Sequence, residues 1–391
     1  MKRFVGLCVV AIVLSFATSF VPTSSASTPN PVAVMHPAAG KPIPGAYIVM
    51  FREGTNLTNL DRGLSAIVAK AKYVYTDGLN GFAADLKDEE LESLKSNPAV
   101  EYIEQDQEVT LDATQSIDSN GGLWGLDRID QRNRPFSNSY TYNTTASNVR
   151  VYVIDTGILT SHPDFGGRAQ ASYDALGGNG QDCNGHGTHV AGTVGGATYG
   201  VAKGVQLRGV RVLGCNGSGS TSGIISAVNW VRTNAVKPAV ANLSLGGGYS
   251  ATLNTAINNL ANSGVFVAVA AGNENQKACN VSPASASAAY TVAASDRNDA
   301  KASFSNFGSC VDGYAPGVGI LATWLNNGTN TISGTSMASP HVAGVAALYK
   351  GNFGEASSAT ITNWLNSNAT ANVITGNPSG TVNRLLFKAG L

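Results

Sequence analysis

Residues 149–157 read Val-Arg-Val-Tyr-Val-Ile-Asp-Thr-Gly, a mostly apolar run that ends in an acidic side chain and a glycine. The run predicts a buried strand, and similar elements follow it along the chain. Further strands are expected at 206–213, 239–245 and 265–270, and helices are expected to begin at His186, Ser222, Ala251 and Thr335. Nearly continuous apolar strands that alternate with helices indicate an α/β fold around a buried, mainly parallel sheet. Open sheets of this kind collect site residues at the carboxyl ends of their strands, which is where Asp155 lies.

Two later segments also hold reactive side chains among glycines. Residues 185–192 read Gly-His-Gly-Thr-His-Val-Ala-Gly, and residues 334–341 read Gly-Thr-Ser-Met-Ala-Ser-Pro-His. An acid, a histidine and a serine can act as a carboxylate that orients a base, the base itself, and a nucleophile. The chain order Asp155, His186, Ser336 is one of three orders in which this geometry is known.

Each of these side chains has a predicted role and an alternative. Ser336 is the predicted nucleophile, because Gly334 lets the backbone approach closely and an apolar helix follows; the alternative is a helix N-cap. His186 is the predicted general base, since an imidazole transfers protons near neutral pH. His189 is interpreted as a structural histidine, because the pair lacks the Glu and the spacing of the zinc peptidase motif.

Two other hydrolase motifs are disfavoured. Asp155-Thr-Gly157 resembles the motif of aspartic peptidases, but those need two copies whose carboxyls share a proton, and no suitable second copy is present. Residues 334–338 end in alanine where the α/β-hydrolase elbow has glycine, and the triad order differs. Asn273 follows a buried strand and could donate to an oxyanion, with a turn-forming asparagine as the alternative.

The N-terminus has the pattern of a secretory signal peptide over residues 1–26: a basic start, an apolar run and small residues at 24–26. The proline-rich stretch 27–44 is expected to be a flexible linker. Signal removal takes away Cys8 and leaves four cysteines, an even number that predicts disulfides in a secreted chain. No Cys-x-x-Cys pair is present, which disfavours a zinc site. Three pairings are possible, and the spacing does not choose among them.

Residues 45–112 predict a small α+β unit. Strands are expected near 47–51 and 100–109, helices over 57–72 and 87–97, and a hairpin over 73–86. The unit carries 13 acidic and 6 basic side chains, whereas residues 113–391 carry 12 acidic and 16 basic ones. Opposite net charges favour association of the two parts, although each charge also serves solubility. The basic side chains are not dense enough to predict nucleic acid binding.

Taken together, these segments resemble the subtilisin-like serine peptidases of the proteinase K and aqualysin branch, over nearly all of residues 123–391. The resemblance implies a three-layer α/β sandwich as the catalytic domain, over 114–391. Residues 45–113 resemble the inhibitory propeptide of the family, a small ferredoxin-like α+β unit, so the mature chain would begin near 113–116. In the family, the positions of Asp155, His186 and Ser336 form the triad, and that of Asn273 contributes to the oxyanion hole.

The resemblance also implies where a peptide substrate binds. The matching positions are Gly217, Ser218, Gly219, Ser244, Leu245, Gly246, Ala270, Ala271 and Gly272. The first three belong to an edge segment that pairs with an extended peptide, and the others line the first specificity pocket. Recognition through the backbone implies broad specificity, with a preference for apolar or aromatic side chains.

Disulfides and structural calcium are implied as well. The family pairing would be Cys183–Cys215 and Cys279–Cys310. One calcium site would use Asp312 with the carbonyls of Ser287 and Ala289, and a second would use Asp127, Asp130 and Gln131. Such oxygen donors suit a hard cation. In one relative, two further positions of the second site are an acidic and an amide residue, whereas this chain has Ser137 and Ser139.

The sequence therefore predicts a secreted serine endopeptidase that is made as a self-processing zymogen. Polypeptides are the expected substrates and its own propeptide the expected inhibitor. A monomer is expected, with no membrane attachment once the signal is removed. Two alternatives are a catalytically inactive homologue that binds peptides and a secreted binding protein whose motifs are structural. The intact triad and oxyanion positions disfavour both.

Overall fold

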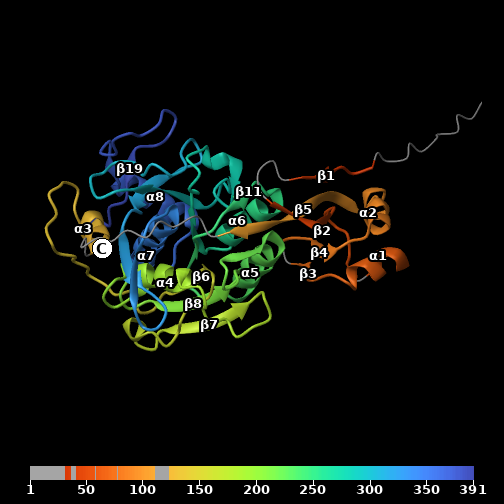
Figure 1. Cartoon of the computed structure of the whole chain (residues 1–391), viewed down its shortest axis with the longest axis horizontal. Helices are drawn as coiled ribbons and strands as arrows, with labels where there is room; N and C mark the ends of the chain where they lie inside the picture. Colours follow the sequence, from red (N-terminus) through yellow and green to blue (C-terminus); the bar gives the residue numbers. More distant parts are fainter. Residues whose placement is uncertain (1–30, 37–40, 58, 77, 111–122) are drawn as a thin grey trace, which may run out of the picture.

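The computed structural model describes residues 31–36, 41–57, 59–76, 78–110 and 123–391 (Figure 1). The expected signal peptide over 1–26 and the expected start of the mature chain near 113–116 lie outside these residues. We call residues 31–110 the N-terminal unit and residues 123–391 the C-terminal unit. In Figure 1 the two units lie side by side along the long axis of the molecule.

The C-terminal unit is built around a nine-stranded sheet. In spatial order its strands are β18 (Thr370–Ala371), β19 (Arg384–Leu385), β15 (Gly313–Pro316), β14 (Tyr290–Ser295), β12 (Phe266–Ala270), β10 (Ala239–Leu243), β6 (Arg150–Asp155), β8 (Gln206–Arg211) and β7 (Ala169–Asp174). Within this described sheet, every neighbouring pair is parallel except β18 with β19. The expected mainly parallel sheet is therefore confirmed.

Helices cover both faces of this sheet. One face carries α4 (His186–Gly195), α7 (Thr335–Phe353) and α8 (Ser358–Asn368), and the other carries α5 (Thr221–Asn234) and α6 (Ala251–Asn262). Along β6, Val151 and Val153 join the first core while Tyr152 and Ile154 join the second, as the two-residue alternation of a strand requires. The result is the three-layer α/β sandwich that was expected.

Short elements complete the C-terminal unit. They are α3 (Trp124–Asp130), the hairpin of β16 (Ile320–Thr323) and β17 (Thr329–Ile332), the pair β11 (Gly247–Gly248) and β13 (Val281–Ser282), the edge strand β9 (Ser218–Ser220), and the 3-10 turns η1 (Pro163–Phe165) and η2 (Ala278–Asn280).

Serine side chains fix the starts of two long helices. Ser220 accepts from Gly223 N at 3.1 Å and Ser250 accepts from Leu253 N at 3.1 Å. These caps place the first residues of α5 and α6 at or within one residue of the predicted starts.

The N-terminal unit has two helices and contributes five strands to a six-stranded sheet, whose sixth strand is β9 of the C-terminal unit. Its strand order is β1 (Val34–Met35), β5 (Val100–Thr110), β2 (Lys41–Phe51), β4 (Gly81–Asp85) and β3 (Tyr73–Tyr75), and its helices are α1 (Arg62–Val68) and α2 (Asp88–Lys95). Phe51, Phe82 and Ile103 pack beneath the helices in a small core of their own. The expected α+β unit and the hairpin of β3 and β4 are both present.

Two local expectations for this unit differ from the structure. Part of the expected linker 27–44 forms strands: β1 pairs in parallel with β5 at Ile103, and β2 begins at Lys41. The prolines of this stretch are tolerated because the pairing of β2 with β5 shifts register between Pro42 and Tyr47. The first helix is also shorter than predicted, because the Asp61 side chain accepts from Leu64 N at 2.9 Å and starts it at Arg62.

The second face of the N-terminal sheet rests on α5 and α6 (Figure 1). Ile48, Met50 and Tyr75 belong to the same buried cluster as the apolar side chains of these helices. Tyr75 Oη donates to Ser222 O at 3.3 Å, and Tyr73 Oη donates to Ala175 O at 3.0 Å. The two units therefore share a core that includes specific polar contacts.

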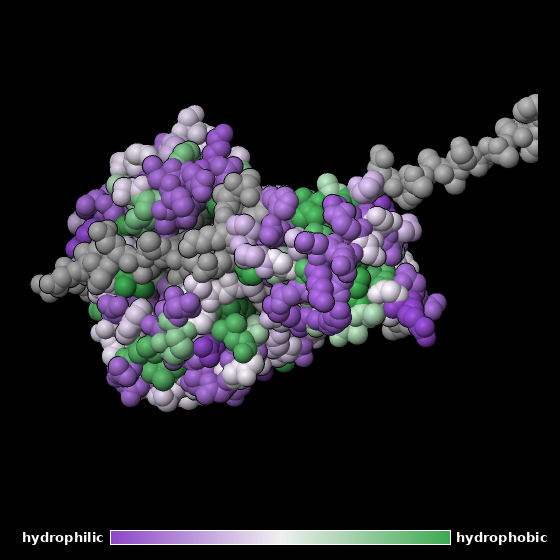
Figure 2. Space-filling model, turned by 45° about the vertical axis from the view of Figure 1, so that its right-hand side comes forward, coloured by the Kyte–Doolittle hydropathy of each residue, from purple (hydrophilic) through white to green (hydrophobic). Residues whose placement is uncertain are grey.

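Among the described residues, none of the helices has the length and apolar character needed to cross a membrane. Figure 2 shows apolar side chains on the visible face in separate patches between polar ones.

Candidate active site

Asp155 and His186 meet at the end of the central strand. Asp155 is the last residue of β6 and is fully buried, and His186 is the first residue of α4. His186 Nδ1 lies 2.8 Å from Asp155 Oδ1 and 3.0 Å from Oδ2. Because a carboxylate can only accept, the contact places the ring proton on Nδ1 and leaves Nε2 as the basic nitrogen. Thr156 N donates to the same Asp155 Oδ1 at 2.7 Å and helps to orient the carboxylate.

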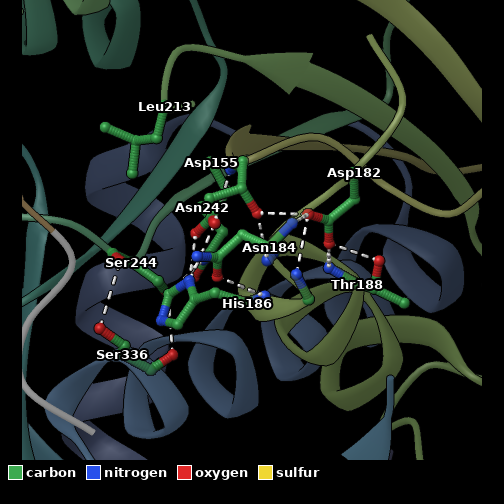
Figure 3. Close-up of polar contacts among 12 residues, drawn as sticks. Asp155, Asp182, Asn184, His186, Thr188, Leu213, Asn242, Ser244 and Ser336 are labelled. Atoms are coloured by element: carbon green, nitrogen blue, oxygen red, sulfur yellow. Dashed lines mark hydrogen bonds and ion pairs between the residues drawn. The ribbon is translucent and has the colours of Figure 1, made fainter. Parts of the chain in front are cut away.

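Ser336 lies in the first turn of α7, and Figure 3 shows the His186 ring between it and Asp155. Ser336 Oγ donates to Ser244 O at 3.1 Å, while Ser244 Oγ donates to Ser336 O at 2.7 Å. Asn242 Nδ2 donates to Ser244 Oγ at 2.9 Å and continues the network into β10. The structure therefore brings the three residues of the predicted triad together from three different elements. The Ser336 hydroxyl is bonded to Ser244 O in this structure. Hydrogen bonds of catalytic groups often form or tighten only when substrate binds, so this contact is compatible with a nucleophilic serine.

The predicted oxyanion donor, Asn273, is held by its side-chain oxygen at the start of α7, with its amide nitrogen beside Gly334. Asn273 Oδ1 accepts from Thr335 N and from Thr335 Oγ1, each at 2.9 Å. Within the described part of the chain, Asn273 Nδ2 is buried and has no hydrogen-bond partner. A Cβ on Gly334 would lie 3.4 Å from Asn273 Nδ2 and 3.6 Å from Ser336 N. Glycine thus leaves room between two N–H donors, which is the arrangement that can hold an anionic oxygen.

The predicted substrate edge is paired with the chain's own N-terminal unit. Strand β9 pairs antiparallel with the end of β5, with Ser220 opposite Glu108, Gly219 opposite Val109 and Thr110 opposite Ser218. On the neighbouring strand β11, Gly248 O accepts from Gln107 Nε2 at 3.1 Å. An extended segment is therefore added as a strand at the place where a peptide substrate was predicted to bind.

The predicted specificity-pocket residues follow the ends of β10 and β12. Ser244, Leu245, Ala270 and Ala271 are buried, and Gly246 lies between the strands β10 and β11. Gly272 has a φ of +96°, and a Cβ there would come within 2.3 Å of the Asn306 side-chain nitrogen. Only glycine fits this turn, because both the backbone angle and the close approach exclude a side chain.

Two acidic side chains of β5 enter the C-terminal unit at helix starts. Asp106 Oδ1 accepts from Ser222 N on α5 at 3.1 Å, and Glu104 Oε2 accepts from Thr252 N on α6 at 3.2 Å. Each carboxyl side chain also contacts the hydroxyl of its partner residue. Both are 4% exposed, and burial raises the pKa of each carboxyl while these hydrogen bonds oppose the rise.

Neither of these contacts is among those predicted from the sequence. A signal was present, since Glu104 and Asp106 are two residues apart on a predicted strand and so share a face. Helix N-termini favour negative charge, so this acidic pair could have been predicted to contact helix starts of the C-terminal unit.

His189 lies outside the Asp155–His186 contact, in agreement with its interpretation as a structural residue. Its Nε2 lies 3.0 Å from Ile320 O and 3.1 Å from Asn330 O, and its ring meets Trp324 edge-on. Burial lowers the pKa of His189 to about 3, so the ring stays neutral and donates to these carbonyls.

The implied cysteine pairing is confirmed. Cys183 is bonded to Cys215 and Cys279 to Cys310, with sequence separations of 32 and 31 residues. The first disulfide lies beside the histidine loop, because Asn184 Nδ2 donates to Cys215 O at 3.0 Å.

The implied calcium ligands differ in how they are arranged. Asp312 Oδ2 accepts from Thr291 N at 2.8 Å, and burial raises the pKa of Asp312 to about 6. A desolvated carboxylate fits a cation, which would offset the cost of burying its charge. Among the described residues, no cluster of three or more acidic, histidine or cysteine side chains is present, so backbone and hydroxyl oxygens would have to complete either site.

The three side chains implied for the second calcium site each have a different partner in the protein. Ser137 Oγ lies 2.9 Å from Asp127 Oδ1 and 2.8 Å from Ser139 Oγ, so the two serines keep oxygen atoms beside Asp127. Asp130, in contrast, forms an ion pair with Lys388 at 2.9 Å. Gln131 Nε2 donates to Pro135 O at 2.7 Å. The oxygen atoms around Asp127 are of the kind that a hard cation takes, but Asp127 already accepts from Ser137 N at 3.1 Å and from Asn138 N at 2.5 Å, and the charge of Asp130 is compensated by Lys388.

Two family models match the chain, that of the Subtilase family over residues 146–390 and that of Peptidase inhibitor I9 over residues 46–112. The chain is similar to an extracellular serine proteinase of Thermus sp. (strain Rt41A), with 47% identity over 402 aligned positions that cover 96% of each protein. It is also similar to Proteinase R of Parengyodontium album, with 46% identity and 90% of each protein covered. The crystal structure of a cold adapted subtilisin-like serine proteinase matches with a TM-score of 0.67 and 52% identity, covering 69% of this chain and 99% of that chain.

Proposed function

Because the chain belongs to the subtilase family of serine peptidases, with an I9 inhibitor unit before the peptidase domain, we propose that Asp155, His186 and Ser336 form its catalytic triad. The protein is an extracellular serine proteinase and a peptide hydrolase. The Asp155–His186 contact at 2.8 Å, at the carboxyl end of the central strand, carries the triad assignment.

The proposed reaction begins when Ser336 Oγ attacks the carbonyl carbon of the peptide bond. His186 Nε2 takes the hydroxyl proton as the new C–O bond forms and then gives it to the leaving nitrogen. Asp155 keeps the Nδ1 tautomer and stabilises the imidazolium. Water then attacks the acyl-enzyme with His186 again as the base, which releases the acid product and restores Ser336.

The negative oxygen of the tetrahedral intermediate would be held by Asn273 Nδ2 and Ser336 N. The observation that supports this is the buried amide nitrogen without a partner among the described residues, since such a donor is otherwise costly. Its two acceptor contacts with Thr335 fix the orientation of the amide before substrate arrives.

Peptide substrates would be read mainly through their backbone. We assign Gly217, Ser218 and Gly219 to the edge with which an extended substrate pairs as an added strand, in the way that β5 pairs with β9. The pocket for the side chain before the scissile bond would be lined by Ser244, Leu245, Gly246, Ala270, Ala271 and Gly272. Small and apolar walls support broad specificity, with a preference for apolar or aromatic residues.

The N-terminal unit acts as an intramolecular inhibitor in this proposal. Its strand β5 occupies the proposed substrate edge, so substrate and inhibitor compete for the same backbone groups. We propose domain limits of 1–26 for the signal, 27–44 for a connecting segment, 45–113 for the propeptide and 114–391 for the catalytic domain. Ser336 would cut its own chain near 113–116, and the mature enzyme would act as a monomer.

Calcium would be structural and would take no part in the reaction. Asp312 with the carbonyls of Ser287 and Ala289 would hold one ion, because the Asp312 carboxyl is desolvated. Asp127, Asp130 and Gln131, together with the serines at 137 and 139, form the weaker proposed site. When bound, the ion would supply charge compensation and tie loops together.

The test is Ser336→Ala, compared with Ser333→Ala as a matched control. Ser333 is 1% exposed and accepts from Gly319 N at 2.9 Å, so its loss removes a buried hydroxyl without touching the proposed chemistry. Mass spectrometry of the secreted proteins should show an uncut Ser336→Ala precursor and a processed Ser333→Ala enzyme. Casein hydrolysis should fall by at least about 1000-fold in Ser336→Ala alone. Wild-type cleavage by Ser336→Ala would refute the mechanism.

A further inference from the structure

One buried carboxylate outside the triad ties the histidine loop to the Asp155 loop. Asp182 is 7% exposed. Within the described part of the chain its two oxygens accept five hydrogen bonds. Oδ1 accepts from Thr156 Oγ1, Asn184 N and Gly185 N, each at 2.9 Å, and Oδ2 accepts from Thr188 N at 2.9 Å and Thr188 Oγ1 at 2.6 Å. Figure 3 shows Asp182 beside the start of α4, on the side away from Ser336.

These donors belong to the two segments that carry the proposed acid–base pair. Asn184 and Gly185 directly precede His186, and Thr188 lies in the first turn of α4. Thr156 directly follows Asp155 and completes the connection, since its N–H donates to Asp155 Oδ1 at 2.7 Å and its hydroxyl oxygen accepts from Gly187 N at 2.9 Å. One carboxylate is therefore bonded to both sides of the Asp155–His186 contact.

The glycines of both segments allow this close approach. A Cβ on Gly157 would lie 3.0 Å from Asp182 N and 2.6 Å from Gly180 O. A Cβ on Gly187 would lie 2.1 Å from Gly157 O and 3.1 Å from Asp155 Oδ1. The segments are packed backbone to backbone, so a small displacement of one is transmitted to the other. A negative charge at the start of α4 is also favoured by the helix dipole.

We propose that Asp182 is a positioning residue for the Asp155–His186 pair, which it holds in the relative orientation that proton transfer needs. It acts through Thr156 and the start of α4 and does not touch the reacting atoms. Its three backbone and two hydroxyl donors all require an acceptor, which an amide nitrogen cannot supply. Misplacement of a catalytic group by about 1 Å can cost about 100-fold in rate. The inference rests on the proposed triad.

The test compares Asp182→Asn with Asp174→Asn. Asp174 is a matched control: its side chain is 5% exposed, and it accepts from Leu176 N at 2.8 Å and Gly180 N at 2.9 Å. It orders the loop up to Gly180 and forms an ion pair with Arg211 at 3.5 Å, but the hydrogen bonds of its carboxylate go neither to Thr156 nor to residues 184–188. Both variants should lose stability. Only Asp182→Asn should lower kcat, by about 10- to 100-fold, with KM changed less than about twofold.

A second readout separates positioning from mere folding. The proton shared by Asp155 and His186 gives a far-downfield proton NMR signal, which depends on the geometry of that hydrogen bond. The signal should shift or broaden in folded Asp182→Asn and keep its wild-type position in Asp174→Asn. Wild-type kcat and an unchanged signal in Asp182→Asn would overturn the proposal, as would the same loss in both variants.

A second pair of variants decides the case where Asp182→Asn does not fold. Thr156→Val removes, at nearly constant volume, the hydroxyl that donates to Asp182 Oδ1 and accepts from Gly187 N, whereas Thr156→Ser keeps it. The valine variant should show the fall in kcat and the NMR change, and the serine variant should show neither; equal kcat values would overturn the proposal. Labelling of Ser336 by a serine-directed phosphonate in each variant keeps failure of this inference distinct from failure of the triad.

Discussion

Asp106 on β5 accepts a hydrogen bond from Ser222 N at 3.1 Å, which places a propeptide carboxylate on the first turn of α5 in the peptidase domain. Glu104, two residues earlier, makes the same contact with Thr252 on α6. The net charges of the two units differ in sign, but the contacts of Asp106 and Glu104 join particular residues, which attraction between net charges does not require. They fix the register in which β5 reaches β9.

We predict that Asp106→Ala in the isolated propeptide weakens inhibition of the mature enzyme by about 10- to 100-fold. The substitution leaves a buried helix N–H and a hydroxyl without their acceptor, which costs about 1–3 kcal/mol. The inhibition constant with a peptide substrate measures the effect. Glu101→Ala is the matched control, since Glu101 is an exposed acid on the same strand. If both variants inhibit equally well, net charge and not the helix contact determines affinity.

The same two carboxyls give the association a pH dependence. Burial raises the pKa of Glu104 and Asp106 in the complex above that of the free propeptide, so the complex binds protons more tightly. The resulting contribution is fully present below the ordinary pKa near 4 and is lost as pH rises through the raised values. Affinity should therefore fall from pH 4 toward neutrality. Calorimetric titration of Ser336→Ala mature domain with propeptide measures this change.

The control for this prediction is the propeptide with both Glu104→Gln and Asp106→Asn. Its affinity should vary less over the same pH range, because the two titrating groups are gone. The tyrosines of the interface do not interfere, since burial raises the pKa of Tyr73, Tyr75 and Tyr102 above an ordinary value of 10. An affinity that rises toward neutral pH would show that the helix starts favour the charged carboxylates more than burial opposes them.

The sequence predicted the layers of the fold and indicated a candidate triad because both depend on local patterns. Apolar strands, a strand-terminal acid and glycine-flanked segments are visible in short windows around Asp155, His186 and Ser336. Contacts that join distant segments are not visible in this way. Asp182 is an ordinary loop acid in sequence, and its bond to Thr156 exists only because Gly157 lets two loops meet. The early start of β2 likewise depends on pairing with a distant part of β5, because Lys41 lies opposite Glu108 and Pro42 opposite Gln107, and this pairing overrides the prolines.

We predict that Asn273→Ala lowers kcat by about 100- to 1000-fold with little change in KM, because the lost donor acts on the transition state. Initial rates on a soluble peptide substrate, normalised to folded enzyme, measure the loss. Asn275→Gly is a suitable control: Asn275 follows the same strand, its φ of +49° suits glycine, and its side chain accepts from Lys301 Nζ at 2.9 Å. A proportional rise in KM instead would mean that Asn273 binds the ground state.

Removal of either disulfide should lower the free energy of unfolding by about 3–4 kcal/mol, because each closes a loop of similar length. Denaturant unfolding of paired Cys→Ala variants in the Ser336→Ala background avoids self-digestion. In the active background, loss of Cys183–Cys215 should also lower kcat, since Cys215 O accepts from Asn184 beside His186. The Cys279–Cys310 pair is the control for this second effect. Equal kcat in both paired variants would count against it.

The calcium proposal predicts that the more stable of the wild-type and Asp312→Asn proteins depends on whether calcium is present. In excess chelator, the wild-type protein must bury a carboxylate whose pKa burial raises to about 6, so at pH 8 that charge is destabilising. Asp312→Asn removes the charge and keeps an oxygen that can accept from Thr291 N. With chelator at pH 8, Asp312→Asn should therefore melt at or above the wild-type temperature. In millimolar calcium the order should reverse, because binding to the native state alone stabilises it by mass action.

Asp127→Asn is the comparison for the second proposed calcium site. Differential scanning calorimetry in the Ser336→Ala background measures the melting temperature of the wild-type, Asp312→Asn and Asp127→Asn proteins. A full calcium-dependent rise in melting temperature for Asp312→Asn, together with its loss in Asp127→Asn, would place the stabilising ion at Asp127 instead.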